Sequence, residues 1–334
     1  MRRLDVLSAS LLLATAACSN SVADGMGAGG SSAHTSAATT GSTSAGTGTA
    51  SSGSSSSTSS SGSGGAGTSV TLTLDSFTVP PGGEVYYCQD FANPFGGVDA
   101  EVSEFESHMA VGSHHMLLFY KPGATDTPLA TCSGLEFAAT PYGSQQQDDS
   151  LSFPTGIAAL LPGSDGLRIQ SHYLNVTPNT ITSSVKVTLH LAEPGSVQYQ
   201  AGVLFVIDTD INVAPASSAV VSNDCTLPVD MNMLRASSHM HMHGTAFDAT
   251  VAGNDVYQTT AWSDPVPALF APAKAMKAGD PLHFQCSFTN NGTTPLTFGE
   301  SALTDEMCIF TASFYPTPAG QATIDASNCV ASQH

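Results

Sequence analysis

Short runs of alternating apolar and polar residues, separated by turn-forming residues, constrain the fold of this chain more than any other feature of its sequence. The runs at residues 70–74, 185–191 and 282–288 alternate with a period of two, which is typical of strands that bury one face. Asn291-Gly292, shortly after the third run, is a typical hairpin turn. No segment combines helical periodicity with caps at both ends. The pattern therefore predicts an all-β fold.

The chain is long enough for two domains of this kind. It has 334 residues, of which 10% are charged and 7% aromatic, and this composition disfavours long surface helices rich in Glu and Lys. We expect two consecutive antiparallel β-sandwiches, jelly-roll-like in form, at residues 69–196 and 197–330.

The charge balance excludes one broad class of partner. The chain has 8 Lys and Arg against 27 Asp and Glu, which gives a formal net charge of −19. Nucleic acids demand a basic surface, so we expect no nucleic-acid partner. No apolar run reaches the roughly 20 residues that a transmembrane helix needs.

The N-terminus, residues 1–18, has the features of a targeting segment. Two arginines after Met1 precede a short apolar stretch, and small residues precede Cys18. This resembles the lipobox of bacterial lipoproteins, except that Thr15 stands where Leu is usual. The resemblance implies a lipidated Cys18 and an exported protein anchored in the cell envelope, at the outer membrane or cell surface. Ordinary secretory cleavage is the alternative, and both routes lead to an oxidising compartment.

Residues 19–68 form a low-complexity segment of Ser, Gly, Thr and Ala with a single charged residue, Asp24. Such a composition buries too little apolar surface to offset chain entropy, so we expect a flexible tether. A random coil of this length spans roughly 40 Å.

The chain has seven cysteines, and six remain when Cys18 is set aside. In an exported protein, six cysteines indicate three disulfides, although sequence alone leaves the pairing open. Two of the six lie in the first predicted domain and four in the second, so every bridge can close within one domain. No C-x2-C pair is present to favour a zinc site.

Histidines are the candidates for chemistry. Strand alternation places His190 and His283 on polar, solvent-facing sides of their strands, which disfavours a functional role. In the first predicted domain, His114 and His115 are adjacent, and neighbouring side chains on a regular strand point to opposite faces. Both rings can reach one ion only at a bend or strand end. His172 is a third candidate, and three imidazoles suit copper or zinc.

The second predicted domain contains the stretch HMHMHG. His239 and His241 are two residues apart and project to one face of a strand, and alternation alone does not exclude His243. The methionines of this region are Met231, Met233, Met240 and Met242. Thioether sulfur is a soft ligand that selects copper(I), although methionine also fills gaps in cores.

The motifs SHHMLLFY, IQSHYLN, HMHMHG and GESALTDEMCIFTASFYP together resemble, in order and spacing, the copper type II ascorbate-dependent monooxygenases. Peptidylglycine α-hydroxylating monooxygenase and dopamine β-monooxygenase are members of that family. The resemblance covers nearly all of residues 69–330 and implies two copper ions per chain, with O2 and ascorbate or a similar electron donor. It implies insertion of one oxygen atom into a C–H bond of a small organic substrate.

The resemblance also implies the ligands. The electron-transfer copper would take His114, His115 and His172. The catalytic copper would take His239, His241 and Met307, with His243 outside the ligand set. The implied disulfides are Cys88–Cys132, Cys225–Cys329 and Cys286–Cys308, and the last would fix the loop that carries Met307.

The sequence departs from the peptidylglycine member at the groups that hold the substrate's carboxylate. By the resemblance, an Arg before the H-x-H motif and an Asn and a Tyr after the Met-Cys pair correspond to Ser237, Ile309 and Phe310 here. Arg235, with the same strand parity as Ser237, is a candidate replacement. We therefore expect a neutral, largely apolar or aromatic substrate rather than a glycine-extended peptide.

Two other functions fit the same residues. One is an exported copper-binding or copper-sequestering protein without turnover, which the Met-rich and His-rich stretch suggests. The other is a surface adhesion or scaffold module with structural metals.

Overall fold

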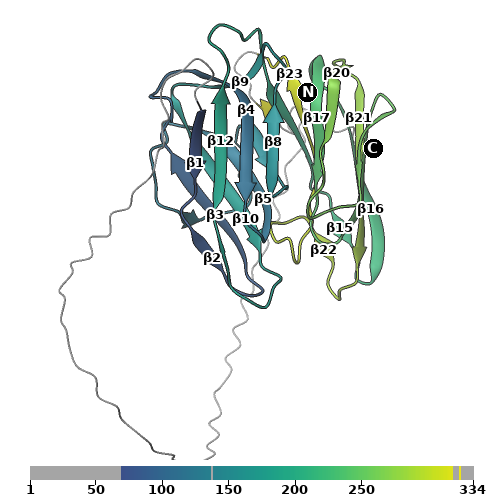
Figure 1. Ribbon diagram of the computed structural model, residues 1–334. Coiled ribbons are helices and arrows are strands. Elements are labelled where there is room, and N and C mark those ends of the chain that lie inside the picture. The colour runs from purple at the N-terminus through teal and green to yellow at the C-terminus, as the bar shows by residue number, and fades with distance from the viewer. Residues whose placement is uncertain (1–68, 137, 319–322, 325–334) are drawn as a thin grey trace, which may run out of the picture. The chain divides into compact units, whose positions relative to one another are not determined.

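The computed structural model describes residues 69–136, 138–318 and 323–324, which all belong to one compact unit. The regular elements in these ranges are all β-strands, and turns and bends connect them (Figure 1). The prediction of an all-β fold is therefore confirmed. No helix that could cross a membrane occurs among the described residues. The predicted signal segment with Cys18 and the predicted tether lie outside the described residues.

Residues 69–200, which we call the first part of the chain, form two main antiparallel sheets. One is ordered β1-β12-β4-β9-β13, with β8 also paired to β4. Its strands are β1 (Ser69–Thr73), β4 (Ala100–Met109), β8 (Asp148–Ser152), β9 (Ile157–Leu161), β12 (Val185–Leu191) and β13 (Tyr199–Gln200), of which β13 pairs with β9 in parallel. The other is ordered β6-β3-β10-β5-β7. Its strands are β3 (Glu84–Phe91), β5 (Ser113–Pro122), β6 (Ala130–Thr131), β7 (Tyr142–Ser144) and β10 (Asp165–Leu174). β2 (Phe77–Val79) pairs with β11 (Ile181–Ser183).

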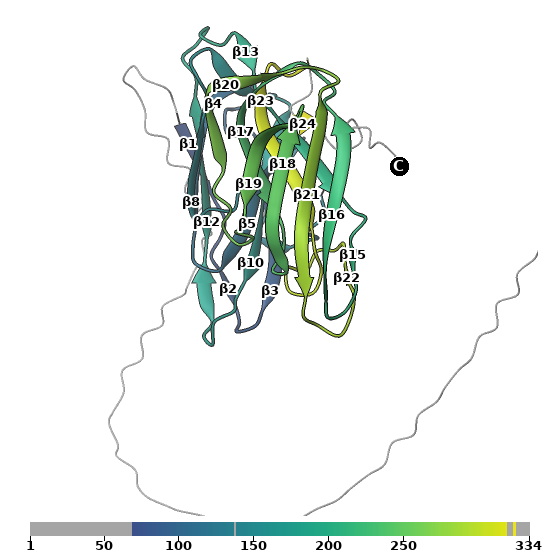
Figure 2. The same ribbon diagram turned by 90° about the vertical axis from the view of Figure 1, so that its right-hand side faces the viewer.

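The described residues from 202 onward, which we call the second part of the chain, also form two main sheets. One is ordered β20-β17-β23-β14-β24, from β14 (Gly202–Asp208), β17 (Met231–His239), β20 (Ala268–Met276), β23 (Cys308–Tyr315) and β24 (Thr323–Ile324). The other is ordered β16-β21-β18-β19 and faces the viewer in Figure 2. Its strands are β16 (Ser217–Thr226), β18 (Gly244–Val251), β19 (Asn254–Thr259) and β21 (Pro281–Asn290). β15 (Asn212–Val213) pairs with β22 (Leu296–Thr297).

Two clusters of buried apolar side chains correspond to these two parts. The first contains Phe105 and Leu118, and the second contains Phe284 and Phe310. The alternation seen in the sequence explains them, since Leu282, Phe284, Cys286 and Phe288 of β21 are buried while the residues between them are half-buried. The predicted domain boundary is not tested by this arrangement and stays a prediction.

The Met-rich stretch divides between core and surface. Met231, Met233 and Met240 are buried in the second core, whereas Met242 is 40% exposed. Three of these four methionines therefore fill the core. Strand alternation and residue type also predict Met242 as a core residue, and this is wrong because Met242 falls in the turn after β17.

Candidate metal centre

A β-bulge brings His114 and His115 to the same region. Along the β10–β5 pair, His172 is opposite His115 but Tyr173 is opposite Ser113, so His114 is an extra residue without a partner of its own. A bulge of this kind bends the strand and re-aims a side chain. The ring centroids of His114 and His115 lie 5.2 Å apart, and each lies 5.1 Å from that of His172. This bulge is the local bend that two adjacent histidines of a strand need if both rings are to reach one ion.

The second pair of histidines lies at the end of a strand and in the turn that follows. His239 is the last residue of β17, and His241 lies in the turn to β18. Their ring centroids are 5.1 Å apart. Gly244 closes this turn, where an added Cβ would lie 2.8 Å from the Cβ of Met240. The turn therefore needs glycine for steric reasons, which explains why the HMHMHG stretch ends in Gly244.

The two histidine groups form one continuous cluster. The ring centroid of His239 is 4.8 Å from that of His114 and 4.9 Å from that of His115. One ligand atom each from His114, His115 and His172 lies within 4.8 Å of the others, and the same holds for His114, His239 and His241. His114 thus belongs to both groups, whereas the resemblance implied two separate ligand sets.

The cluster contains buried nitrogen atoms without hydrogen-bond partners. They are both ring nitrogens of His114, Nδ1 of His115, Nδ1 of His172, Nε2 of His239 and Nε2 of His241. Leaving a buried polar atom unpaired costs about 1–3 kcal/mol. A bound metal ion would satisfy these atoms, and neutral imidazole is a common ligand for copper and zinc. The residues therefore fit a metal centre.

Acceptors on the outer side of three rings fix their orientation. The Nε2 of His172 lies 2.8 Å from a carboxylate oxygen of Glu84. The Nδ1 of His239 lies 2.8 Å from the side-chain oxygen of Gln145, and that of His241 lies 3.1 Å from the carbonyl oxygen of Asp305. An acceptor at one ring nitrogen holds the proton there, so the other nitrogen is available as a ligand. In all three rings the available nitrogen is the unpartnered one.

Burial keeps these imidazoles neutral. It lowers the pKa values of His114, His115 and His239 well below the ordinary range, and neighbouring histidines lower them further. Burial also lowers the pKa of His241 to about 4. The pKa of His172 is lowered by burial, although the Glu84 carboxylate opposes the shift. Neutral imidazoles bind metal without first releasing a proton.

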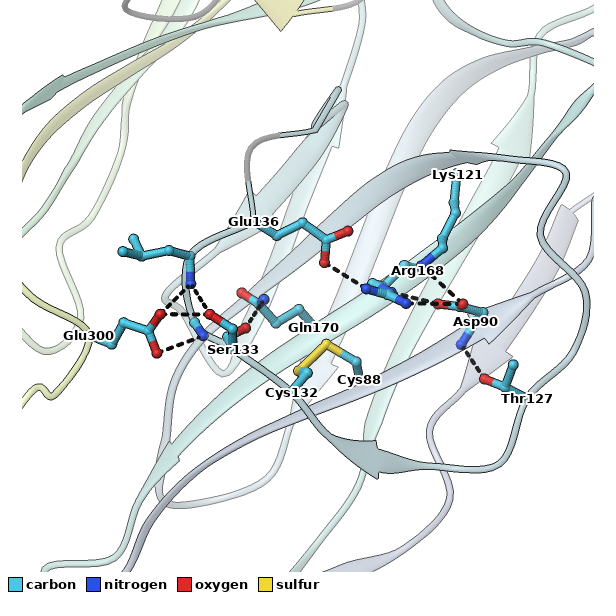
Figure 3. The surroundings of a disulfide bond; sticks show 12 residues. Cys88, Asp90, Lys121, Thr127, Cys132, Ser133, Glu136, Arg168, Gln170 and Glu300 are labelled. Atoms are coloured by element: carbon cyan, nitrogen blue, oxygen red, sulfur yellow. Dashed lines mark hydrogen bonds and ion pairs between the residues drawn. A yellow bond between two sulfur atoms is a disulfide. The ribbon is translucent and has the colours of Figure 1, made fainter.

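Two glutamates tie the loop before Met307, residues 299–306, to the first part of the chain. Glu84 of β3 accepts hydrogen bonds from the Ser301 hydroxyl, at 2.6 Å, and from the Ala302 N–H. Conversely, Glu300 of the loop accepts hydrogen bonds from two groups of the first part, Ser133 Oγ at 2.7 Å and the N–H of Gly134 at 3.0 Å (Figure 3). We call residues 299–306 the Glu300 loop.

Tyr86 adds to the attachment of the Glu300 loop. Its hydroxyl donates to the carbonyl of Glu300 at 2.6 Å. Its ring stacks on His172, with centroids 3.8 Å apart and planes 14° apart. The loop and His172 therefore share Glu84 and Tyr86 as neighbours.

Met307 follows the Glu300 loop and is 4% exposed. Cys308, the next residue, forms a disulfide with Cys286 of β21. Glu306, on the other side of Met307, is fully buried and accepts hydrogen bonds from the backbone N–H groups of His241, at 3.1 Å, and His243, at 2.8 Å. Burial raises the pKa of Glu306 to about 8. Glu306 therefore connects the H-x-H turn directly to Met307.

Two further predictions from the sequence concern His243 and the disulfides. His243 contacts the Glu306 carboxylate through Nδ1, at 3.1 Å, and belongs to neither group of candidate ligands. A second disulfide joins Cys88 to Cys132 (Figure 3). Cys329 lies outside the described residues, so the pairing Cys225–Cys329 stays a prediction.

An apolar cavity of about 140 Å³ adjoins the cluster. His115 and His239 lie in its wall together with Met307, and strands from both parts of the chain line it. This volume is close to that of apolar cavities, about 150 Å³, that hold one small aromatic molecule.

One expectation about this cavity is wrong. Phe310 does not face the substrate space, because it is fully buried in the second core. Alternation along β23 instead places Ile309 and Thr311 in the cavity wall. Ser237 lines the cavity as expected. Arg235 lines it too, and its Nη2 donates to the Asp149 carboxylate at 2.7 Å.

Sequence reasoning missed the residues that support the rings. Nothing in the sequence marks Glu84 or Gln145, because each meets its histidine only through the fold, at a separation of 88 and 94 residues. Glu306 is adjacent to Met307 in the sequence, and a carboxyl group beside a predicted ligand was a usable signal.

The second part of the chain matches a known family. Residues 199–334 match the family model described as copper type II ascorbate-dependent monooxygenase, C-terminal domain. No curated protein sequence gives a significant match.

Solved structures show only distant likeness. The structure of PNGase F, a glycosylasparaginase from Flavobacterium meningosepticum, is 11% identical, with 77% of this chain and 98% of that chain covered and a TM-score of 0.37. A recombinant N-glycanase F is 12% identical, with 75% and 97% covered and a TM-score of 0.32. Scores this low support no argument.

Proposed function

We propose that this protein is an exported copper-dependent monooxygenase that inserts one oxygen atom from O2 into a C–H bond of a small organic substrate. Ascorbate or another one-electron donor would supply the electrons. The observation that carries the proposal is the cluster of buried, neutral imidazoles with unpartnered nitrogen atoms beside an apolar cavity. The family match over residues 199–334 supports the same conclusion.

The ligand assignment follows the two groups in the cluster. His114, His115 and His172 would hold one copper ion, and His239, His241 and Met307 would hold the other. Thioether is a soft donor that favours copper(I). Copper, when bound, would supply the one-electron storage and the activation of O2 that no side chain provides.

The residues of the chain position the reactants and exclude water. Glu84, Gln145 and the Asp305 carbonyl hold the outer ring protons, which leaves the inner nitrogen atoms available as ligands. The apolar cavity would place a substrate C–H bond next to His239 and Met307. In the balanced reaction, one atom of O2 enters the C–H bond as a hydroxyl group. The other leaves as water with two protons and the two donated electrons.

The cavity supports a substrate other than a glycine-extended peptide. The position two residues before the H-x-H motif is Ser237, and the cavity face of β23 presents Ile309 and Thr311. Arg235 already pairs with Asp149, so it does not offer an uncompensated charge to a carboxylate. We further propose that lipidated Cys18 anchors the protein in the cell envelope.

The test is oxygen uptake by the copper-loaded full chain with ascorbate and a panel of small aromatic and aliphatic substrates. We expect uptake that requires both reductant and substrate, with one atom of labelled O2 recovered in the product. His241→Ala should abolish it. Tight copper binding without turnover would instead identify a copper-sequestering protein, and unfolding on chelation would identify a structural metal.

The structure weakens the argument for a copper-sequestering protein without turnover. That reading rested on a stretch rich in methionine and histidine, yet Met231, Met233 and Met240 pack in the core. They are not available on the surface to pass copper to another protein.

A further inference from the structure

The wall of the cavity that comes from the second part of the chain has a regular order. β23 pairs antiparallel with β17 on one side and antiparallel with β14 on the other. Residues in register therefore form rows across three strands, and every second row faces the cavity. Three such rows line it: His239, Ile309 and Ile207; then Ser237, Thr311 and Phe205; then Arg235, Ser313 and Val203.

A β-bulge sets which residues of β17 belong to these rows. The pairing of β17 with β23 shifts by one residue between Met233 and Arg235. Met233 therefore points into the core, whereas Arg235 lines the cavity, although both positions are odd in number. The bulge therefore places Arg235 in the cavity wall.

The rows change in chemistry along the cavity. The row at the metal centre presents two isoleucines beside His239, and the far row presents Arg235 and Ser313. The two ends are four residues apart along β17, which corresponds to about 13 Å between backbone positions. The cavity is therefore apolar at the metal centre and polar at its other end.

The polar end is close to electrically neutral. Arg235 donates one hydrogen bond to Asp149, and Asp149 also accepts a hydrogen bond from Tyr142 at 3.2 Å. Glu136 in the cavity wall is paired with Arg168 at 2.9 Å. A guanidinium has further N–H donors beyond the one that Asp149 uses. An incoming carboxylate would be repelled by Asp149, whereas a neutral acceptor would not.

We propose, on the basis of the proposed function, that the substrate is an uncharged amphiphile held by Arg235 and Ser313 at its acceptor group. A carbonyl, amide or hydroxyl oxygen meets the far row, and an apolar chain or aromatic ring lies along Phe205, Ile207 and Ile309. The C–H bond to be oxidised then lies beside His239. Arg235 acts as the specificity-determining residue for neutral acceptors.

The test compares three probes that differ only at one end: 4-phenylbutanamide, 4-phenylbutanoate and butylbenzene. Binding to the full chain is measured by calorimetry, with and without copper. We expect the amide to bind about 5–10-fold more tightly than either of the others, as one or two added hydrogen bonds would give. Tighter binding of the carboxylate would overturn the proposal, because Arg235 would then act as an anion clamp.

Variants identify the residues responsible. Arg235→Lys keeps the charge next to Asp149 but loses the planar set of donors, so it should remove the preference for the amide without weakening butylbenzene. Ser313→Ala should reduce the preference in part. Arg168→Lys is the matched control, since Arg168 also pairs with a carboxylate but does not line the cavity. A preference unchanged in Arg235→Lys would contradict the proposal.

The two proposals can fail separately. Binding is measured without reductant, so it does not depend on oxygenation. If the amide binds as expected but the copper-loaded protein with ascorbate yields no hydroxylated product, the monooxygenase function is wrong and the cavity assignment stands. If product forms while the amide has no advantage over butylbenzene, the cavity assignment is wrong.

Discussion

The two groups of candidate ligands belong to one cluster, but different elements of the fold position them. His115 and His172 are directly paired residues of neighbouring strands inside a sheet, and His114 joins them through a bulge. His241 and Met307 lie outside strands. Glu306, next to Met307, binds the turn of His241, and the disulfide from Cys308 joins the other side of Met307 to β21. The geometry of the first group follows from backbone hydrogen bonds of the sheet. In the second group only His239 is held by strand pairing, whereas His241 and Met307 depend on side-chain contacts and should respond more strongly to changes around them.

The largest effect is expected from His114, because it belongs to both groups. His114→Ala should reduce copper binding at both positions, whereas His172→Ala and His241→Ala should each remove one of the two expected copper ions. Metal analysis after dialysis measures the stoichiometry. Trp262, the only tryptophan of the chain, lies 5.6 Å from His114 between ring centroids, so quenching of its fluorescence reports copper binding.

The result also decides whether the groups are independent. If His172→Ala and His241→Ala each lose all copper, the five imidazoles hold a single shared ion. In that case the comparison between the two groups would apply to one centre rather than two.

Removal of the disulfides should have the next largest effect. The cysteines are separated by 22 residues in Cys286–Cys308 and by 44 in Cys88–Cys132. Loop-closure entropy then predicts that replacement of each pair by alanine costs about 3–4 kcal/mol, as urea denaturation would measure. Only the Cys286→Ala, Cys308→Ala variant should also lower copper(I) affinity at the Met307 group. Equal loss of affinity in both variants would contradict a specific role in presenting Met307.

Glu84 connects the two groups, because it contacts both His172 and the Glu300 loop. Glu84→Gln should lower copper affinity at the His114, His115 and His172 group by about 10–100-fold, as is usual for groups that orient a ligating histidine. Glu300→Gln is the matched control, since Glu300 fastens the same loop to Ser133. Competition with a copper chelator measures both. If the two variants lose affinity equally, attachment of the loop matters rather than orientation of His172.

The fold could be predicted from local patterns where one face of a strand is buried. The 282–288 run shows this, because its apolar residues alternate and all of them reach the core. The failure at Phe310 has a related cause. Residue type and alignment with a family motif suggested a position in the cavity, but strand parity places Phe310 in the core and Thr311 in the wall.

The site was only partly predictable. Its histidines are marked by their own clustering in the sequence, but the bulge at His114 and the bulge near Arg235 are set by pairing with distant strands. The supporting groups Glu84, Gln145 and Asp149 carry no local signal. Gln145 and Asp149 meet their partners only where the two parts of the chain come together, and Glu84 meets His172 only through the pairing of β3 with β10.

The smallest effect is expected at His243, which distinguishes a residue of the motif from a ligand. His243 contacts Glu306 through its ring, but Glu306 also accepts from the backbone N–H groups of His241 and His243. His243→Ala should therefore leave copper stoichiometry unchanged and lower the free energy of unfolding by about 1 kcal/mol, the typical net value of one hydrogen bond. Urea denaturation and metal analysis on the same preparation measure both quantities, with His241→Ala alongside for comparison. Loss of one copper ion in His243→Ala would make His243 a ligand and would move the second centre further into the turn.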